Sequence, residues 1–238
     1  MLTDNPVAFE RDYIATLGLK PHYGCTQIIP PEDMVIVAQD IYLISSVIAK
    51  VATDWRHLAR SEIAEIFESM GEGQVGSSTM PQKRNPWNLE HVCSLFKVLK
   101  SKLFLLEDDV ISEHQRDLTN SASSRFYFEF FAVSYLMLDR FTNITSKIQV
   151  DEKNMAENFK KAGSSIYAEA LYVSLTKEGR GNAHDLVREA SRESEAKGID
   201  LLDVLKNKKL INASLTQDVL TDKVLSGTKQ KLATILGS

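Results

Sequence analysis

The sequence predicts an all-α protein, an elongated bundle of long helices followed by a small C-terminal helical domain. Apolar residues recur at helical spacing along most of the 238-residue chain, and no stretch of alternating apolar and polar residues meets a hairpin turn. Three long segments lack both glycine and proline, whereas glycines punctuate the chain after residue 150. We therefore expect residues 1–150 to form part of a central helical bundle and residues 151–238 to form a small C-terminal helical domain.

The first helix is expected to begin at Pro6 and to end near Gly18. A loop should follow as far as Pro31, because consecutive prolines oppose a helix. A long helix is then expected from Glu32 to about Phe67. Its apolar stripe is wider than a coiled-coil seam, so we expect neighbouring helices on more than one side of it.

Residues 71–86 break the helical pattern with three glycines and two prolines, which predicts a polar loop. Another helix is expected from Trp87 to about Val110. A third should run from about Thr119 to Ile148, after a polar interruption at residues 112–118. Three long helices without intervening strands indicate an elongated bundle.

Composition argues against several classes of protein. The 32 acidic and 28 basic residues are scattered along the chain, so no basic stripe predicts a nucleic-acid partner. Cys25 and Cys93 lack the spacing of metal ligands, which predicts free thiols in a reducing cytosol and no metal site. The N-terminus lacks the apolar core of a signal peptide. The longest apolar runs, Ile41–Ala52 and Phe126–Leu138, are shorter than the roughly 20 residues of a membrane span. A cytoplasmic protein without a membrane partner is expected.

The most informative stretch is residues 76–86, Gly-Ser-Ser-Thr-Met-Pro-Gln-Lys-Arg-Asn-Pro. It resembles the signature loop of the fumarase/aspartase superfamily, GSSxMPxKxNP, at every defined position. The resemblance implies a β-elimination that releases fumarate, with Ser77 as the base that removes a proton beside a carboxylate. The resulting carbanion delocalises into that carboxylate, so the charge of Lys83 and the amide donors of Asn85 are suited to stabilising it. A serine can act as this base only where loop amides and Lys83 stabilise its oxyanion in a dry site.

The resemblance also implies roles for two further residues of the motif and for one residue after it. Ser78 and Met80 are expected to contact substrate. Glu90 lies thirteen residues beyond Ser77, where the superfamily has a glutamate that pairs with its catalytic histidine. The alternative for Glu90 is a solvated carboxylate favoured by the dipole at the start of a helix. Beside the motif we favour the catalytic role.

A second cluster, residues 114–125, resembles the adenylosuccinate lyase pattern in which an Arg-Asp pair is followed by serine and then arginine. The resemblance implies that Arg116, Ser121 and Arg125 hold the phosphate of a nucleotide substrate. Two guanidinium groups and a hydroxyl suit a phosphate dianion, although arginines beside Asp117 could instead form surface ion pairs. Upstream, Gln27 resembles a substrate-binding glutamine of that family, but residues 28–33 depart from the family pattern.

The resemblance covers the whole chain and implies the C-terminal portion of such a lyase. The N-terminal domain and the first part of the central bundle, which carry the general-acid histidine, are expected to be missing. None of the five histidines lies in the family's catalytic-histidine motif, so the chain alone is expected to be inactive. The family implies a full-length homotetramer, sites shared by three subunits, a nucleotide substrate from purine biosynthesis and no cofactor.

Two alternatives stay open at this stage. One is a sister lyase of the superfamily, such as argininosuccinate lyase. The other is a helical oligomerisation module that keeps the scaffold without catalysis. The presence of Ser77, Lys83 and Asn85 argues against the second alternative.

Overall fold

The structure is a computed structural model that describes residues 3–22, 24–25, 28–69, 85–113 and 117–237. The all-α prediction is confirmed, because helices make up nearly all of its regular structure. The chain forms two compact units, Met1–Asp151 and Glu152–Ser238.

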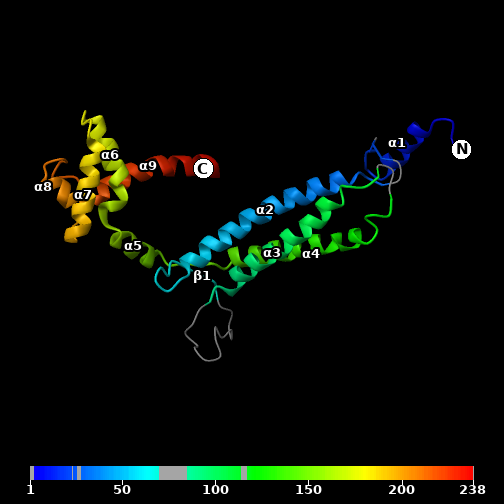
Figure 1. Ribbon diagram of the computed structural model, residues 1–238, viewed down its shortest axis with the longest axis horizontal. Helices are drawn as coiled ribbons and strands as arrows, with labels where there is room; N and C mark the ends of the chain where they lie inside the picture. Colours follow the sequence, from blue (N-terminus) through cyan, green and yellow to red (C-terminus); the bar gives the residue numbers. More distant parts are fainter. Residues whose placement is uncertain (1–2, 23, 26–27, 70–84, 114–116, 238) are drawn as a thin grey trace, which may run out of the picture. The chain divides into compact units, whose positions relative to one another are not determined.

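The first unit is built on three long helices, which lie side by side in Figure 1. Its elements are α1 (Pro6–Thr16), α2 (Pro31–Leu58), β1 (Ile66–Phe67), α3 (Trp87–Asp108), the 3₁₀ helix η1 (Ser123–Phe126), α4 (Tyr127–Thr145) and β2 (Gln149–Val150).

Two apolar clusters hold the three helices together. Near the start of α2, Val35 and Ala38 pack with residues from the end of α3 and with Phe130 of α4. Near the end of α2, Ala49 and Ala52 pack with Leu89 at the start of α3, and with residues of α4. The start of α3 therefore meets the end of α2, so α3 runs antiparallel to α2.

The helix expected from Glu32 to Phe67 ends nine residues early, and that expectation was wrong at its C-terminal end. After Leu58 the chain turns, with Ala64 in a left-handed conformation (φ 53°) and the Glu65 amide donating back to the Leu58 carbonyl. Ile66 and Phe67 then pair antiparallel with Val150 and Gln149. No glycine or proline lies in this turn, so the local sequence does not predict the end of the helix. The helix ends here because the following residues pair with a distant strand.

The third predicted helix also begins later than expected. Residues 119–122 form turns, and the α-helix starts only at Tyr127. Side chains of this segment bond to the end of α3: Asn120 Nδ2 donates to the Asp109 carbonyl (2.5 Å), and Ser123 Oγ donates to the Asp109 carboxylate (2.7 Å). Serine and asparagine compete in this way with helix formation.

Among the described residues, α2 is the one helix long and apolar enough to cross a membrane by length and composition. The apolar run Ile41–Ala52 lies within this helix and is shorter than it. In the structure, α2 packs along α3 and α4, as a bundle helix does. Large apolar side chains of α2 nevertheless remain exposed in the isolated chain, including Ile36, Leu43 and Val47.

The second unit contains α5 (Glu152–Lys161), the 3₁₀ helix η2 (Gly163–Tyr167), α6 (Ala168–Lys177), α7 (Ala183–Lys197), α8 (Leu201–Asn207) and α9 (Gln217–Leu236). Its core includes Leu171 and Leu175 of α6, Val187 of α7 and Leu205 of α8. Asp200 caps α8 by accepting from the Leu202 amide (2.9 Å), and it also accepts from the Ser164 hydroxyl (2.5 Å) and amide (3.1 Å).

Asp200 predicts a pH dependence of this unit's stability. Partial burial acts to raise the pKa of Asp200, but the hydrogen bonds from Ser164 and Leu202 outweigh it and hold the pKa below the ordinary value of 3.8. A lowered folded-state pKa stabilises the fold above the unfolded pKa, and this contribution is lost as the pH falls through the folded pKa.

We expect Asp200→Asn to lower the free energy of unfolding at pH 7 by about 1 kcal/mol. The difference from wild type should shrink below about pH 4, where the wild-type carboxyl also becomes neutral. Urea unfolding of both proteins at several pH values measures this difference in the free energy of unfolding. A difference that stays constant down to pH 2 would contradict this account.

Candidate functional site

Six of the ten predicted site residues lie outside the described residues: Ser77, Ser78, Met80 and Lys83 of the signature segment, together with Gln27 and Arg116. The structure places the other four: Asn85, Glu90, Ser121 and Arg125. They lie in two clusters.

The first cluster surrounds the start of α3, directly after the signature segment. Pro86 precedes the helix and provides no side-chain cap. Glu68 caps α3 instead: its carboxylate accepts from the Leu89 amide (2.7 Å), the Asn88 amide (3.2 Å) and the Asn88 side-chain Nδ2 (2.8 Å). A carboxylate is favoured here, because the first amides of a helix lack partners and carry the positive end of its dipole.

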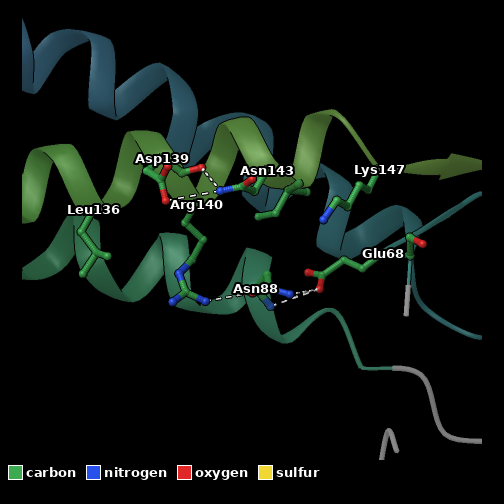
Figure 2. Close-up of a pocket in the computed structure, with 9 residues that line it drawn as sticks. Glu68, Asn88, Leu136, Asp139, Arg140, Asn143 and Lys147 are labelled. Atoms are coloured by element: carbon green, nitrogen blue, oxygen red, sulfur yellow. Dashed lines mark hydrogen bonds between the residues drawn. The ribbon is translucent and has the colours of Figure 1, made fainter. Parts of the chain in front are cut away.

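Arg140 of α4 completes this arrangement, as Figure 2 shows. Its Nη1 donates to Asn88 Oδ1 (2.8 Å), and its guanidinium lies 5.4 Å from the centroid of the Trp87 ring. Glu68, Asn88 and Arg140 border a cavity of about 390 Å³, which Asp139, Asn143 and Lys147 also line.

A second cavity, of about 700 Å³, brings Asn85 and Glu90 together with Arg56 and His57 from the end of α2 and Arg60 from the turn after it. Glu90 Oε1 lies 3.7 Å from Arg56 Nη2, and its side chain is half exposed. Glu62 also lines the cavity, which thus combines an amide and two carboxylates with two arginines and a histidine. The two guanidinium groups can pair with a carboxylated ligand and orient it by hydrogen bonds.

Arg56, His57, Arg60 and Glu68 were not among the residues predicted from the sequence. Arg56 and Arg60 are four residues apart and close to the signature segment, which is the spacing of neighbours on one helical face. That spacing could have singled them out. Glu68 gave no comparable signal, because its partners lie 20 and 21 residues further along the chain.

The second cluster lies where α3 ends. Ser121, Ser124, Asn120 and Tyr127 line a cavity of about 270 Å³. Residues 28–31, which follow Gln27 in the sequence, form its apolar wall. The structure therefore brings the segment after Gln27 to Ser121. Arg125 is exposed on η1, where its amide bonds to the Ala122 carbonyl (3.3 Å), and its guanidinium has no hydrogen bond or ion pair within the part of the chain that the structure describes.

Acidic groups order the polar side chains of this second cluster. Burial raises the pKa of Tyr127, and so does the hydrogen bond of its hydroxyl to Asp109 (2.6 Å). Asp117 accepts from the Thr119 hydroxyl (2.5 Å) and from the amides of Glu113 and Thr119, which together lower its pKa. Asp117 is thus held by its own loop, and its partners among the described residues are Glu113 and Thr119.

The two clusters lie at opposite ends of α3. The helix has 22 residues, which corresponds to about 33 Å at 1.5 Å per residue. One chain therefore does not bring Asn85 and Glu90 to Ser121 and Arg125. Across the described ranges, no group of three His, Cys, Asp or Glu side chains could hold a metal ion.

Comparisons with known proteins match both units. A family model described as adenylosuccinate lyase C-terminal matches residues 112–223, and one described as lyase matches residues 7–98. The chain is 35% identical to an adenylosuccinate lyase of Pyrococcus abyssi over 91% of its length and 49% of the relative's. It is 33% identical to an adenylosuccinate lyase of Helicobacter pylori over 77% of the chain and 42% of the relative.

The fold is similar to that of a solved structure, the beta-carboxy-cis,cis-muconate cycloisomerase of Acinetobacter calcoaceticus. The TM-score is 0.79, with 22% sequence identity, over 98% of this chain and 53% of that one. The chain spans about half the length of the curated relatives it matches.

Proposed function

Since this chain belongs to the adenylosuccinate lyase family, we propose that it serves in the cleavage of adenylosuccinate to AMP and fumarate. The related cleavage of succinylaminoimidazole carboxamide ribotide belongs to the same proposal, as do a place in purine biosynthesis and a cytoplasmic location. One observation carries it: the signature segment leads directly into a cavity where Asn85 and Glu90 lie beside three basic side chains.

In the proposed reaction, Ser77 removes a proton from the carbon beside a carboxylate of the succinyl group. The electron pair of that C–H bond first delocalises into the carboxylate, where Lys83 and Asn85 stabilise the added charge. It then forms the carbon–carbon double bond of fumarate as the C–N bond breaks. The leaving nitrogen takes a proton from a general acid. Glu90 is half exposed in the cavity, where it can contact the group that supplies this proton.

The phosphate of the nucleotide is proposed to bind at the second cluster, through Arg116, Ser121 and Arg125. The unpaired position of Arg125 on the surface supports this role, because a guanidinium without an ion pair keeps its donors for a ligand. A phosphate bound there lies far from Asn85 of the same chain. The proposed site is therefore completed by a second copy of the chain.

A homotetramer is the proposed assembly. The exposed apolar side chains of α2 and α4 support it, because large apolar patches on a soluble protein indicate an interface. Phe128 and Tyr135 of α4 are 77% and 72% exposed, and Leu43 of α2 is 64% exposed. The shared site requires in addition that this packing bring the start of α3 in one subunit near the end of α3 in another.

Mixing two inactive variants tests the shared site. We expect Ser77→Ala and Arg125→Ala to lose activity separately, and to regain up to about a quarter of it after dissociation and reassembly together. The gain arises because some sites then take Ser77 from an Arg125→Ala chain and Arg125 from a Ser77→Ala chain. The assay follows fumarate release by the protein with any sequence encoded upstream of residue 1 included.

The matched control mixes Ser77→Ala with Asn85→Ala. Both changes fall on the same segment of a chain, so every site keeps one defect and no activity should return. Recovery in this control, or none in the first mixture, would contradict the shared site. Turnover of argininosuccinate instead of adenylosuccinate would overturn the substrate assignment.

A further inference from the structure

We propose that Glu68 is a positioning residue for the lyase reaction: it fixes the first turn of α3, and with it Asn85 and Glu90. This inference rests on the proposed function. Glu68 itself borders the 390 Å³ cavity with Arg140, whereas Asn85 and Glu90 line the 700 Å³ cavity. Its role is therefore to hold other groups in place.

The cap that Glu68 provides comes from outside the helix. Helices usually receive a cap from a serine, threonine, aspartate or asparagine at the residue before the first turn. Here Pro86 occupies that position, and the carboxylate of Glu68 accepts three hydrogen bonds from Asn88 and Leu89. These bonds connect Glu68, which precedes residues 70–84, directly with Asn88 and Leu89, which follow them.

The segment that carries Glu68 is also anchored to the chain after α4. The two residues before it, Ile66 and Phe67, pair with β2, which follows α4. The Asp151 amide also donates to the Glu65 carbonyl (2.9 Å). The position of the carboxylate is thus set by the strand pair as well as by α3.

Arg140 fixes which way the Asn88 amide faces. A guanidinium has only donors, so the oxygen of Asn88 must face Arg140 and the nitrogen must face Glu68. A reversed amide would set donor against donor on one side and oxygen against oxygen on the other. The row Arg140, Asn88, Glu68 therefore has a single arrangement of donors and acceptors, which Figure 2 shows as a continuous chain of dashed lines.

This network acts close to the predicted catalytic groups. Asn85 is three residues before Asn88, and Glu90 is two residues after it. The Glu90 amide bonds to the Pro86 carbonyl (3.0 Å), so the first turn moves as one piece. A displacement of about 1 Å in catalytic groups can reduce a rate about 100-fold. Loss of the cap should therefore lower kcat through Asn85 and Glu90.

The experiment compares four variants in the protein with any upstream sequence included. Glu68→Ala should lower kcat for adenylosuccinate about 10- to 100-fold, with a much smaller change in KM. Asn88→Asp should lower kcat to a similar extent, because its carboxylate would face the carboxylate of Glu68. Glu68→Gln combined with Asn88→Asp should restore part of the rate, since the glutamine nitrogen donates to the new carboxylate and its oxygen still accepts from Leu89, while the bond from the amide of residue 88 is lost. The matched control is Asp139→Asn, which removes one charge from the same cavity without touching the cap and should keep wild-type kcat.

A second readout does not depend on activity. Hydrogen exchange of the Asn88 and Leu89 amides should become at least about 10-fold faster in Glu68→Ala and stay unchanged in Asp139→Asn. Wild-type kcat in Glu68→Ala despite faster exchange would overturn the positioning role and leave the proposed function standing. Failure of the double variant to recover kcat would also overturn it. A wild-type protein that does not cleave adenylosuccinate would overturn the proposed function first, and the positioning role with it.

Discussion

Replacing Ser77 by alanine is expected to lower kcat for adenylosuccinate by about 10²- to 10⁴-fold, the usual contribution of a positioned general base. The reason is that alanine cannot accept the proton, while the proposed phosphate and carboxylate contacts remain. Affinity for substrate should therefore change only a few-fold. Fumarate release by the protein with any upstream sequence included gives kcat, and calorimetric titration of the same protein with adenylosuccinate gives the binding constant.

The neighbouring serine provides the matched control for this experiment. Ser78 is predicted to contact substrate, so Ser78→Ala should raise KM more than it lowers kcat. A kcat for Ser77→Ala within threefold of wild type would remove Ser77 as the base. An equal fall in affinity and rate would show that the hydroxyl binds substrate and does not abstract the proton.

Replacing Phe130 by alanine is expected to lower the free energy of unfolding of the first unit by about 3–5 kcal/mol. The side chain is fully buried between α2, α3 and α4, and its ring meets Phe131 edge to face with centroids 5.4 Å apart. Deleting it removes these contacts and leaves a cavity in the cluster that joins the three helices. Urea unfolding followed by circular dichroism measures the loss.

Phe128 is the matched control on the same helix. Its side chain is 77% exposed, so Phe128→Ala should change the free energy of unfolding of the isolated chain by less than about 0.5 kcal/mol. If both variants lose the same stability, the assigned core is wrong. A Phe128 variant that unfolds normally and associates more weakly would agree with the proposed tetramer.

Sequence reasoning succeeded where a local signal defined the element. Pro86 and the unbroken apolar pattern after it predicted a helix from Trp87 to Val110, and α3 occupies Trp87–Asp108. The end of α2 was not predictable in this way. The residues after Leu58 contain no helix breaker, and the strand pair that redirects them lies with residues 149–150, more than eighty positions along the chain.

The same distinction applies to the candidate site. The signature segment pointed to Asn85 and Glu90 from their order in the sequence alone, and the structure places both on one cavity. The basic residues of that cavity and the cap from Glu68 come from the segment before the loop, and periodicity does not reveal which of its side chains turn toward α3.

The amino-acid sequence by itself determined the helical class, the family and the residue types of the chemistry, because apolar spacing and a fixed motif are local properties of the chain. Only the tertiary structure decided where these residues stand. It joined Glu68, Asn88 and Arg140 from three separate segments, and it held Asn85 and Glu90 one helix length away from Ser121 and Arg125. Side-chain hydrogen bonds and helix packing act between residues far apart in the sequence, so their partners are fixed only when the bundle forms.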